Sequence, residues 1–226
     1  LTNMAFHAEQ KVKQQILSTV TMEKLFQLLT EQDEILIVKT LGLLRNLIYY
    51  RPHIDLIMTL YGTKIIQAII MILESEYYSS RIKEQALCIL VNVADGSVSK
   101  DFIMGNEDLL RKINSFMTHS CVQLQIAAVC CISNLLANTD DGAADRQQKL
   151  KEMGAQRILH KISHSSDPFL AEKVKHALQQ FSPLSNLNSL AFGSSSLSSS
   201  NLGGSNNTNN QSTSSSSSSS TTSINS

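Results

Sequence analysis

Histidine and cysteine side chains that could hold a metal ion, or form a nucleophile with its base, gather at one place in the sequence. His119 and Cys121 are two residues apart, and the adjacent Cys130 and Cys131 follow. Thiolate and imidazole are zinc ligands, and a thiol beside an imidazole can act as a nucleophile. Residues two apart on a helix point to nearly opposite faces, however, and a cysteine within an apolar run behaves as a small hydrophobic residue. We therefore predict neither a metal site nor a catalytic thiol here.

The remaining polar clusters do not predict catalysis either. His160 and His164 are four apart, as neighbours on one helix face would be, but no third ligand accompanies them, so we interpret them as a surface pair. Asp140, Asp141 and Gly142 resemble the start of a calcium loop without its spaced acceptors or closing glutamate, and we predict a loop between repeats. A phosphate-binding glycine motif and a nucleophile elbow are both lacking. We expect no enzymatic activity, and no metal, cofactor or small-molecule substrate.

Composition and charge exclude further classes. The 226 residues carry 19 Lys plus Arg against 19 Asp plus Glu, which leaves no net charge to attract nucleic acid. The longest apolar run, Ile65 to Leu73, includes Gln67 and is well short of the roughly 18 residues that a membrane span needs. Four cysteines without disulfide or zinc spacing fit a reducing, intracellular setting. We expect protein partners, with no nucleic acid and no membrane.

Similar segments recur at a fixed interval and indicate repeated structural units. An apolar stretch ends at Asn46, again at Asn92 and again around Asn134, at intervals of 46 and 42 residues. A second landmark is a glycine between two apolar segments, found at Gly62, Gly105 and Gly154. This period is typical of armadillo or HEAT-type repeats, which have two or three helices each.

The content of one period agrees with its length. The spacing predicts a short helix over Ile54 to Leu60 closed by Gly62, a second over Lys64 to Glu74, and a third over Arg81 to Ala94. Nearly all of the last nine residues of the third segment are apolar, so it must be buried against neighbouring repeats. A parallel strand could have the same composition, but the chain has too few glycines for the turns of an α/β fold. We predict an all-α, right-handed solenoid of armadillo repeats.

These units divide the chain into two parts. Residues 1–181 form the predicted armadillo domain: a partial repeat to about Tyr50, then repeats over 52–95, 98–138 and 144–181. The third helix of the last repeat carries several charged residues, as a solenoid cap needs a polar outer face. Residues 182–226 contain 20 Ser, 8 Asn and 4 Thr and no charged residue, which predicts a disordered tail.

Several stretches resemble one family closely. KTLGLLRNLIYYRPHID from Lys39, IKEQALCILVNVADG from Ile82, LQIAAVCCISNLL from Leu124 and KDFIM from Lys100 are similar to the C-terminal end of the armadillo subunit of the CTLH (GID) type ubiquitin ligase. The likeness covers about residues 33–181, and the Ser/Asn tail departs from it. It implies a C-terminal fragment of a non-catalytic scaffold that joins the substrate receptor to the ligase core, in cytoplasm and nucleus. It also implies that the concave face holds the tail of the receptor.

The residues themselves suggest a binding groove. In an armadillo stack the third helices line the concave side, so Asn46, Asn92 and Asn134 should form a ladder. Such amides could clamp the main chain of an extended peptide, or they could satisfy backbone groups where repeats meet. Basic residues on or beside the same helices could pair with a carboxylate, or form a solvated rim; they are Lys39, Arg45, Arg81 and Lys83.

Two functions remain open from the sequence. One is the ligase adaptor, with the partner segment in the groove. The other is an armadillo cargo carrier or junction scaffold unrelated to ubiquitin. Nuclear-import carriers of this fold place Trp one turn before such asparagines, whereas these positions hold Gly42, Cys88 and Cys130. Because the chain has no Trp, we favour the adaptor.

Overall fold

The chain folds into helices throughout the part that the structure describes, residues 1–6 and 8–181 of a computed structural model. In chain order the helices are α1 (Thr2–Ala5), α2 (Gln10–Thr19), α3 (Met22–Leu28), α4 (Glu34–Leu47), α5 (Arg51–Glu74), α6 (Ser80–Val93), α7 (Lys100–Met104), α8 (Glu107–Phe116), α9 (Val122–Leu136), α10 (Ala143–Glu152), α11 (Ala155–Ile162) and α12 (Pro168–Gln180). The predicted disordered tail, 182–226, lies outside the described residues.

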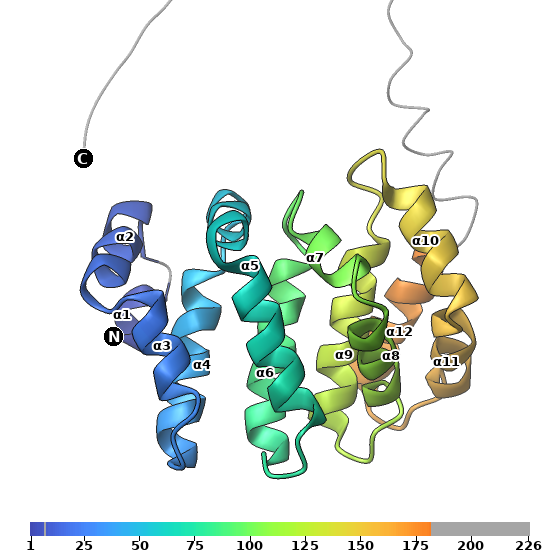
Figure 1. Ribbon diagram of the computed structural model, residues 1–226. Coiled ribbons are helices and arrows are strands. Elements are labelled where there is room, and N and C mark those ends of the chain that lie inside the picture. Colours follow the sequence, from blue (N-terminus) through green and yellow to red (C-terminus); the bar gives the residue numbers. More distant parts are fainter. Residues whose placement is uncertain (7, 182–226) are drawn as a thin grey trace, which may run out of the picture.

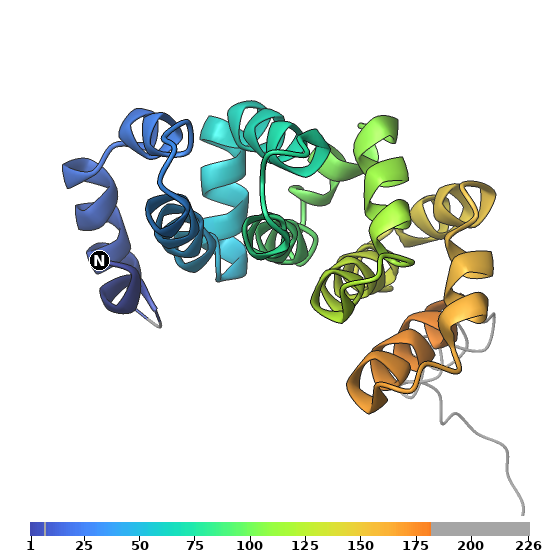
Figure 2. The same cartoon turned by 90° about the horizontal axis from the view of Figure 1, so that it is seen from below.

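The helices form a row of repeated units (Figure 1). The third helices of the units, α4, α6, α9 and α12, pack against one another in sequence. Viewed from below, the row bends into an arc in which these third helices follow the inner side, whereas α3, α5 and α8 follow the outer side (Figure 2). The prediction of an all-α solenoid whose third helices line the concave side is confirmed.

The region before Tyr50, predicted as a partial repeat, contains more structure than expected. Helices α2, α3 and α4 supply the three helices of one unit, and the short α1 packs against α4. The row of third helices begins at α4, which contains the Asn46 landmark, and α1 adds a further short helix beside it. The short α1 was not visible in the sequence because its four residues offer no periodic apolar pattern.

Side-chain caps fix where several of the helices begin. Asp33 accepts hydrogen bonds from the backbone N–H groups of Ile35 and Leu36 at 2.8 and 3.2 Å, and Asp167 accepts one from Leu170 at 2.8 Å. Such caps satisfy N–H groups that have no partner within the helix. They fix the first turns of α4 and α12, two of the third helices on the concave side.

The second repeat differs from the sequence-based expectation, because α5 is one continuous helix of 24 residues. The predicted break at Gly62 is wrong. A Cβ atom at Gly62 would lie only 2.6 Å from Cε1 of Phe102, so this glycine admits the ring of a following helix instead of ending its own. Gly154, with φ of 85°, does adopt the left-handed conformation at the start of α11.

Because α5 is one continuous helix, the membrane argument made from the sequence also changes. By length and composition α5 is long and apolar enough to cross a bilayer, with a mean hydropathy of 1.9 over its most apolar stretch. A core helix of a folded domain passes the same test. Here α5 packs against α6, α7 and α8, and Met58, Ile65 and Ile69 are fully buried in that contact region.

Hydrogen bonds to one carboxylate of α5 hold the loop between the second and third repeats. The carboxylate of Asp55 accepts hydrogen bonds from the backbone N–H groups of Ser97, Val98 and Ser99, each at 3.2 Å, and from the Ser99 hydroxyl at 2.6 Å. Asp55 belongs to the RPHID segment that stood out in the sequence. Its role is to fix the loop that leads from α6 into α7.

Candidate functional site

An open cavity lies on the concave side of the solenoid, between the third helices of successive repeats. Its volume is about 390 Å³. It is lined by Arg45 of α4, by Glu84, Cys88, Val91 and Asn92 of α6, by Gln123, Ile126, Ala127 and Cys130 of α9, and by Phe169 of α12. The wall is mostly apolar, with two charged side chains of opposite sign, so the cavity suits an apolar side chain with polar groups beside it.

The three predicted asparagines occupy equivalent places, and each one bonds the neighbouring repeat. The amide nitrogen of Asn46 donates to the carbonyl of Thr2 at 2.9 Å. Asn92 donates likewise to Arg45 at 3.0 Å, and Asn134 to Val91 at 2.9 Å. The sequence left open a peptide clamp or the satisfaction of backbone groups where repeats meet, and these bonds are of the latter kind. Only Asn92 of the three lines the cavity, and a peptide clamp stays a prediction.

The basic residues proposed for the groove are separated by the fold. Arg45 lines the cavity and donates to the side-chain oxygen of Gln85 at 3.1 Å. Lys39, Arg81 and Lys83 do not line it, and Lys39 and Arg81 are exposed. Burial lowers the pKa of Lys83, and the charge of Lys112 on α8 lowers it further.

The positions that hold Trp in import carriers are small here, and two of them open the cavity. Cys88 and Cys130 lie on its wall, and burial raises the pKa of both thiols. Both sulfurs therefore stay protonated at neutral pH and act as apolar surface. Gly42, the third such position, lies outside the cavity, and a Cβ atom there would meet Cγ2 of Thr2 at 3.5 Å.

Six wall residues were missed by the sequence analysis, namely Glu84, Val91, Gln123, Ile126, Ala127 and Phe169. The most exposed large apolar one is Phe169. Phe169 lies in the first turn of α12 and is 50% exposed, with the Lys173 ammonium 4.9 Å from the ring centroid. Its signal was a large apolar residue directly after Pro168, at the start of a predicted third helix whose other apolar residues have core spacing. Phe169 extends the cavity across the last two repeats.

The remaining histidine and cysteine candidates make local contacts, lie in the core or lie at the surface. The backbone N–H of Cys121 donates to Nδ1 of His119 at 3.0 Å, and Cys131 is fully buried. Within residues 1–6 and 8–181, no three His, Cys, Asp or Glu side chains meet in a way that could hold a metal ion. His160 and His164 do not share a helix face, contrary to the expectation, because α11 ends at Ile162.

The Asp140 segment forms a loop between α9 and α10, as predicted, and its carboxylate pairs with two cations. Arg146 donates to it through Nη1 at 2.7 Å and Nη2 at 3.0 Å, and the Lys100 ammonium lies 3.1 Å away. Lys100 is only 2% exposed. Hydrogen bonds from Arg146 hold the pKa of Asp140 far below its usual range, with the Lys100 ammonium adding to the effect.

The row of helical repeats, with the cavity along its third helices, has the armadillo-repeat fold. Solved structures share this fold. A designed armadillo repeat protein, YIII(Dq)4CqI, has a TM-score of 0.67 at 18% identity over 80% of this chain and 72% of its own. Another, solved in complex with the peptide (KR)4, has a TM-score of 0.68 with the same identity and coverage. At such identities the likeness shows the fold alone.

The sequence is similar to a part of armadillo repeat-containing protein 8. It is 54% identical to the Mus musculus protein and 52% identical to that of Xenopus laevis, over 181 residues that make up 80% of this chain. The match covers 27% and 25% of these relatives, so the chain spans about a quarter of their length. No protein-family profile matches the chain. The predicted resemblance to part of a larger armadillo-repeat protein is thereby confirmed, whereas the ubiquitin-ligase role that it implies stays a prediction.

Proposed function

We propose that this chain is a non-catalytic scaffold of a CTLH (GID) type ubiquitin ligase, which joins the substrate receptor to the ligase core for proteasomal degradation. We further propose that it acts in cytoplasm and nucleus. The similarity to armadillo repeat-containing protein 8 supports this assignment. The observation that carries the binding role is the open, mostly apolar cavity on the concave side.

The cavity indicates what kind of segment would bind. Val91, Ile126 and Ala127 offer an apolar wall, which favours an apolar side chain of an extended partner segment. Arg45 lies at the edge of the same cavity and can pair with a carboxylate of that segment. The designed armadillo protein bound to the peptide (KR)4 supports peptide binding as a use of this fold.

The test is an affinity purification from cell lysate with the full chain as bait, followed by mass spectrometry. Ile126→Arg places a charge on the apolar wall, and Phe169→Ala removes an exposed part of it. Arg111→Ala on α8 is the matched control, because this side chain is 62% exposed and lies away from the cavity. We expect ligase subunits with the wild type and the control, and their loss with both cavity variants.

Two readouts keep this result interpretable. Thermal unfolding followed by circular dichroism shows whether Ile126→Arg is folded. Phe169→Ala is expected to fold like the wild type, because the side chain that it removes is already exposed. Recovery of transport or adhesion proteins without ligase subunits would contradict the adaptor and favour a cargo carrier or junction scaffold. Equal recovery of ligase subunits by the wild type, the two cavity variants and the control would show that the cavity takes no part in the interaction.

A further inference from the structure

A second recess lies at one edge of the solenoid, where the loop between α3 and α4 meets the loop between α5 and α6. Its volume is about 320 Å³, and it is lined by Gln32, Glu34, Ile37, Glu76, Tyr77, Tyr78, Ser79 and Ile82. We propose that this recess binds a lysine or arginine side chain from a basic segment of a partner protein. The site is separate from the concave cavity and does not depend on the proposed ligase role.

Two aromatic rings form one wall of the recess. The ring centroids of Tyr77 and Tyr78 lie 5.5 Å apart, and the ring planes meet at 79°. Tyr77 is 70% exposed, which leaves its ring accessible to a partner. The face of a tyrosine ring attracts ammonium and guanidinium groups, so two rings set at nearly a right angle offer such a group a corner.

The charges and the floor of the recess favour the same occupant. Glu34 and Glu76 are both exposed and supply two carboxylates, and no lysine or arginine is among the residues that line the recess. Ile37 and Ile82 are buried at 1% and 3% exposure and give the recess an apolar floor. The methylene groups of a lysine or arginine can cover such a floor while the charged end reaches the carboxylates and rings.

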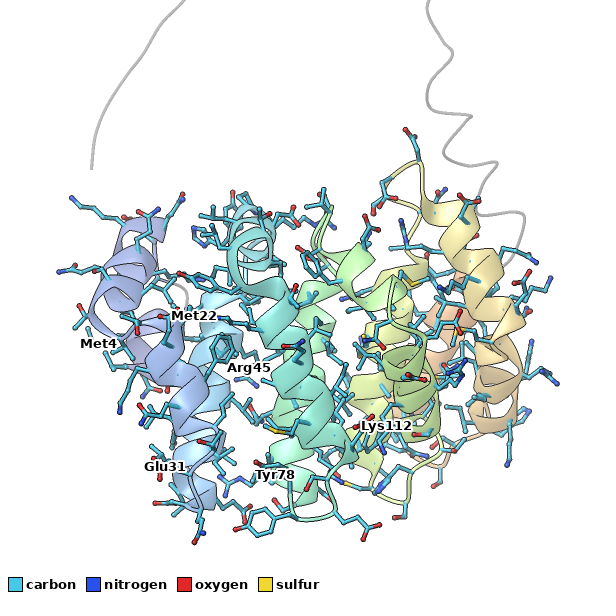
Figure 3. All side chains as sticks on the ribbon, in the orientation of Figure 1. Met4, Met22, Glu31, Arg45, Tyr78 and Lys112 are labelled. Atoms are coloured by element: carbon cyan, nitrogen blue, oxygen red, sulfur yellow. The ribbon has the colours of Figure 1, made fainter. Side chains whose placement is uncertain are left out.

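Hydrogen bonds between two repeats hold this arrangement in place. The Tyr78 hydroxyl donates to the carbonyl of Leu29 at 3.4 Å, and the Ser79 hydroxyl donates to the Glu34 carboxylate at 2.7 Å. Figure 3 labels Tyr78 and, on the preceding repeat, Glu31 at this edge of the molecule. These bonds hold Tyr78 and Glu34 in place before a ligand arrives, so binding costs little ordering of these two side chains.

A fluorescein-labelled, alternating lysine–arginine peptide is a direct probe, with fluorescence anisotropy on the full chain as the readout. Tyr77→Ala should weaken binding about fivefold, since it removes the exposed ring. Glu76→Gln should weaken it as well, and binding of the wild type should fall as salt is raised above about 0.15 M. Both changes affect exposed side chains, so neither is expected to unfold the protein.

Tyr50→Ala and Glu107→Gln are the matched controls. They remove an exposed tyrosine ring and an exposed carboxylate at other places on the surface. The proposal requires both control variants to bind the peptide like the wild type. Absence of saturable binding, or equal affinity of the wild type, Tyr77→Ala and Glu76→Gln, overturns it. Binding that is unchanged in the recess variants but lost in Ile126→Arg would place the peptide in the concave cavity and likewise overturn the proposal.

Discussion

The ring of Phe102 in α7 lies against Gly62 in the middle of α5, with three ring atoms within 2.9 Å of where a Cβ of residue 62 would be. Glycine at the centre of a helix is normally a cost, because it adds backbone freedom to the unfolded chain. Here the absence of a side chain lets the next repeat approach closely. Gly62 therefore marks a contact between two repeats, and α5 continues past it without a break.

Gly62→Ala should lower the free energy of unfolding, although alanine is the better helix former. The added methyl group collides with Phe102 at an overpacking cost of about 1–3 kcal/mol, against a helix-propensity gain of about 1 kcal/mol. Gly42→Ala in α4 is the control, because its Cβ would meet Cγ2 of Thr2 at an ordinary 3.5 Å. Urea unfolding measures both. A more stable Gly62→Ala protein would show that the ring moves aside without cost.

Asn92→Ala and Asn134→Ala should each lower the free energy of unfolding by about 1–2 kcal/mol, since each leaves a partly buried carbonyl without its donor. Gln148→Ala, which breaks an exposed side-chain pair, should cost much less. Urea unfolding tests this order. If all three variants were equally stable, the asparagine bonds would contribute little to the stacking of repeats. The expected loss also means that reduced partner binding by asparagine variants alone would not demonstrate a peptide clamp.

The Asp140 ion pairs should make the protein sensitive to acid. The pKa of Asp140 is lowered in the folded state, so its contribution to stability is fully present above the unfolded pKa of about 3.9. That contribution is lost as the pH falls from there towards the folded pKa. Asp140→Asn should cost about 2–4 kcal/mol at neutral pH, because it leaves the buried Lys100 without a carboxylate partner.

Urea unfolding at several pH values checks this prediction. The stability of the wild type should fall more steeply below about pH 4 than that of Asp140→Asn. Asp108→Asn is the matched control, since Asp108 is 81% exposed beside Arg111 and such pairs contribute less than about 1 kcal/mol. Parallel pH profiles for the wild type and Asp140→Asn would show that the pair does not couple to folding.

The parts of this structure that depend on nearby residues could be predicted from the sequence. The interval between Asn92 and Asn134 and the apolar spacing along α6 were enough to predict the repeated unit and the all-α fold. They also predicted that the third helices line the concave side. The continuity of α5 could not be predicted, because it depends on Phe102 from another helix. Lys83 shows a similar limit: it does not line the cavity, because the side of α6 on which it lies depends on how the helices rotate on packing, which a single sequence does not fix. Phe169 reaches the cavity for the same reason.

The unbroken course of α5 also has a mechanical consequence. The third and fourth repeats each have two shorter outer helices, joined at Gly105 and Gly154, and a joint between short rods can bend. The second repeat has no such joint, since one 24-residue rod runs along its outer side. The solenoid is therefore stiffer at the second repeat, whose α6 supplies four wall residues of the cavity, than at the two later repeats.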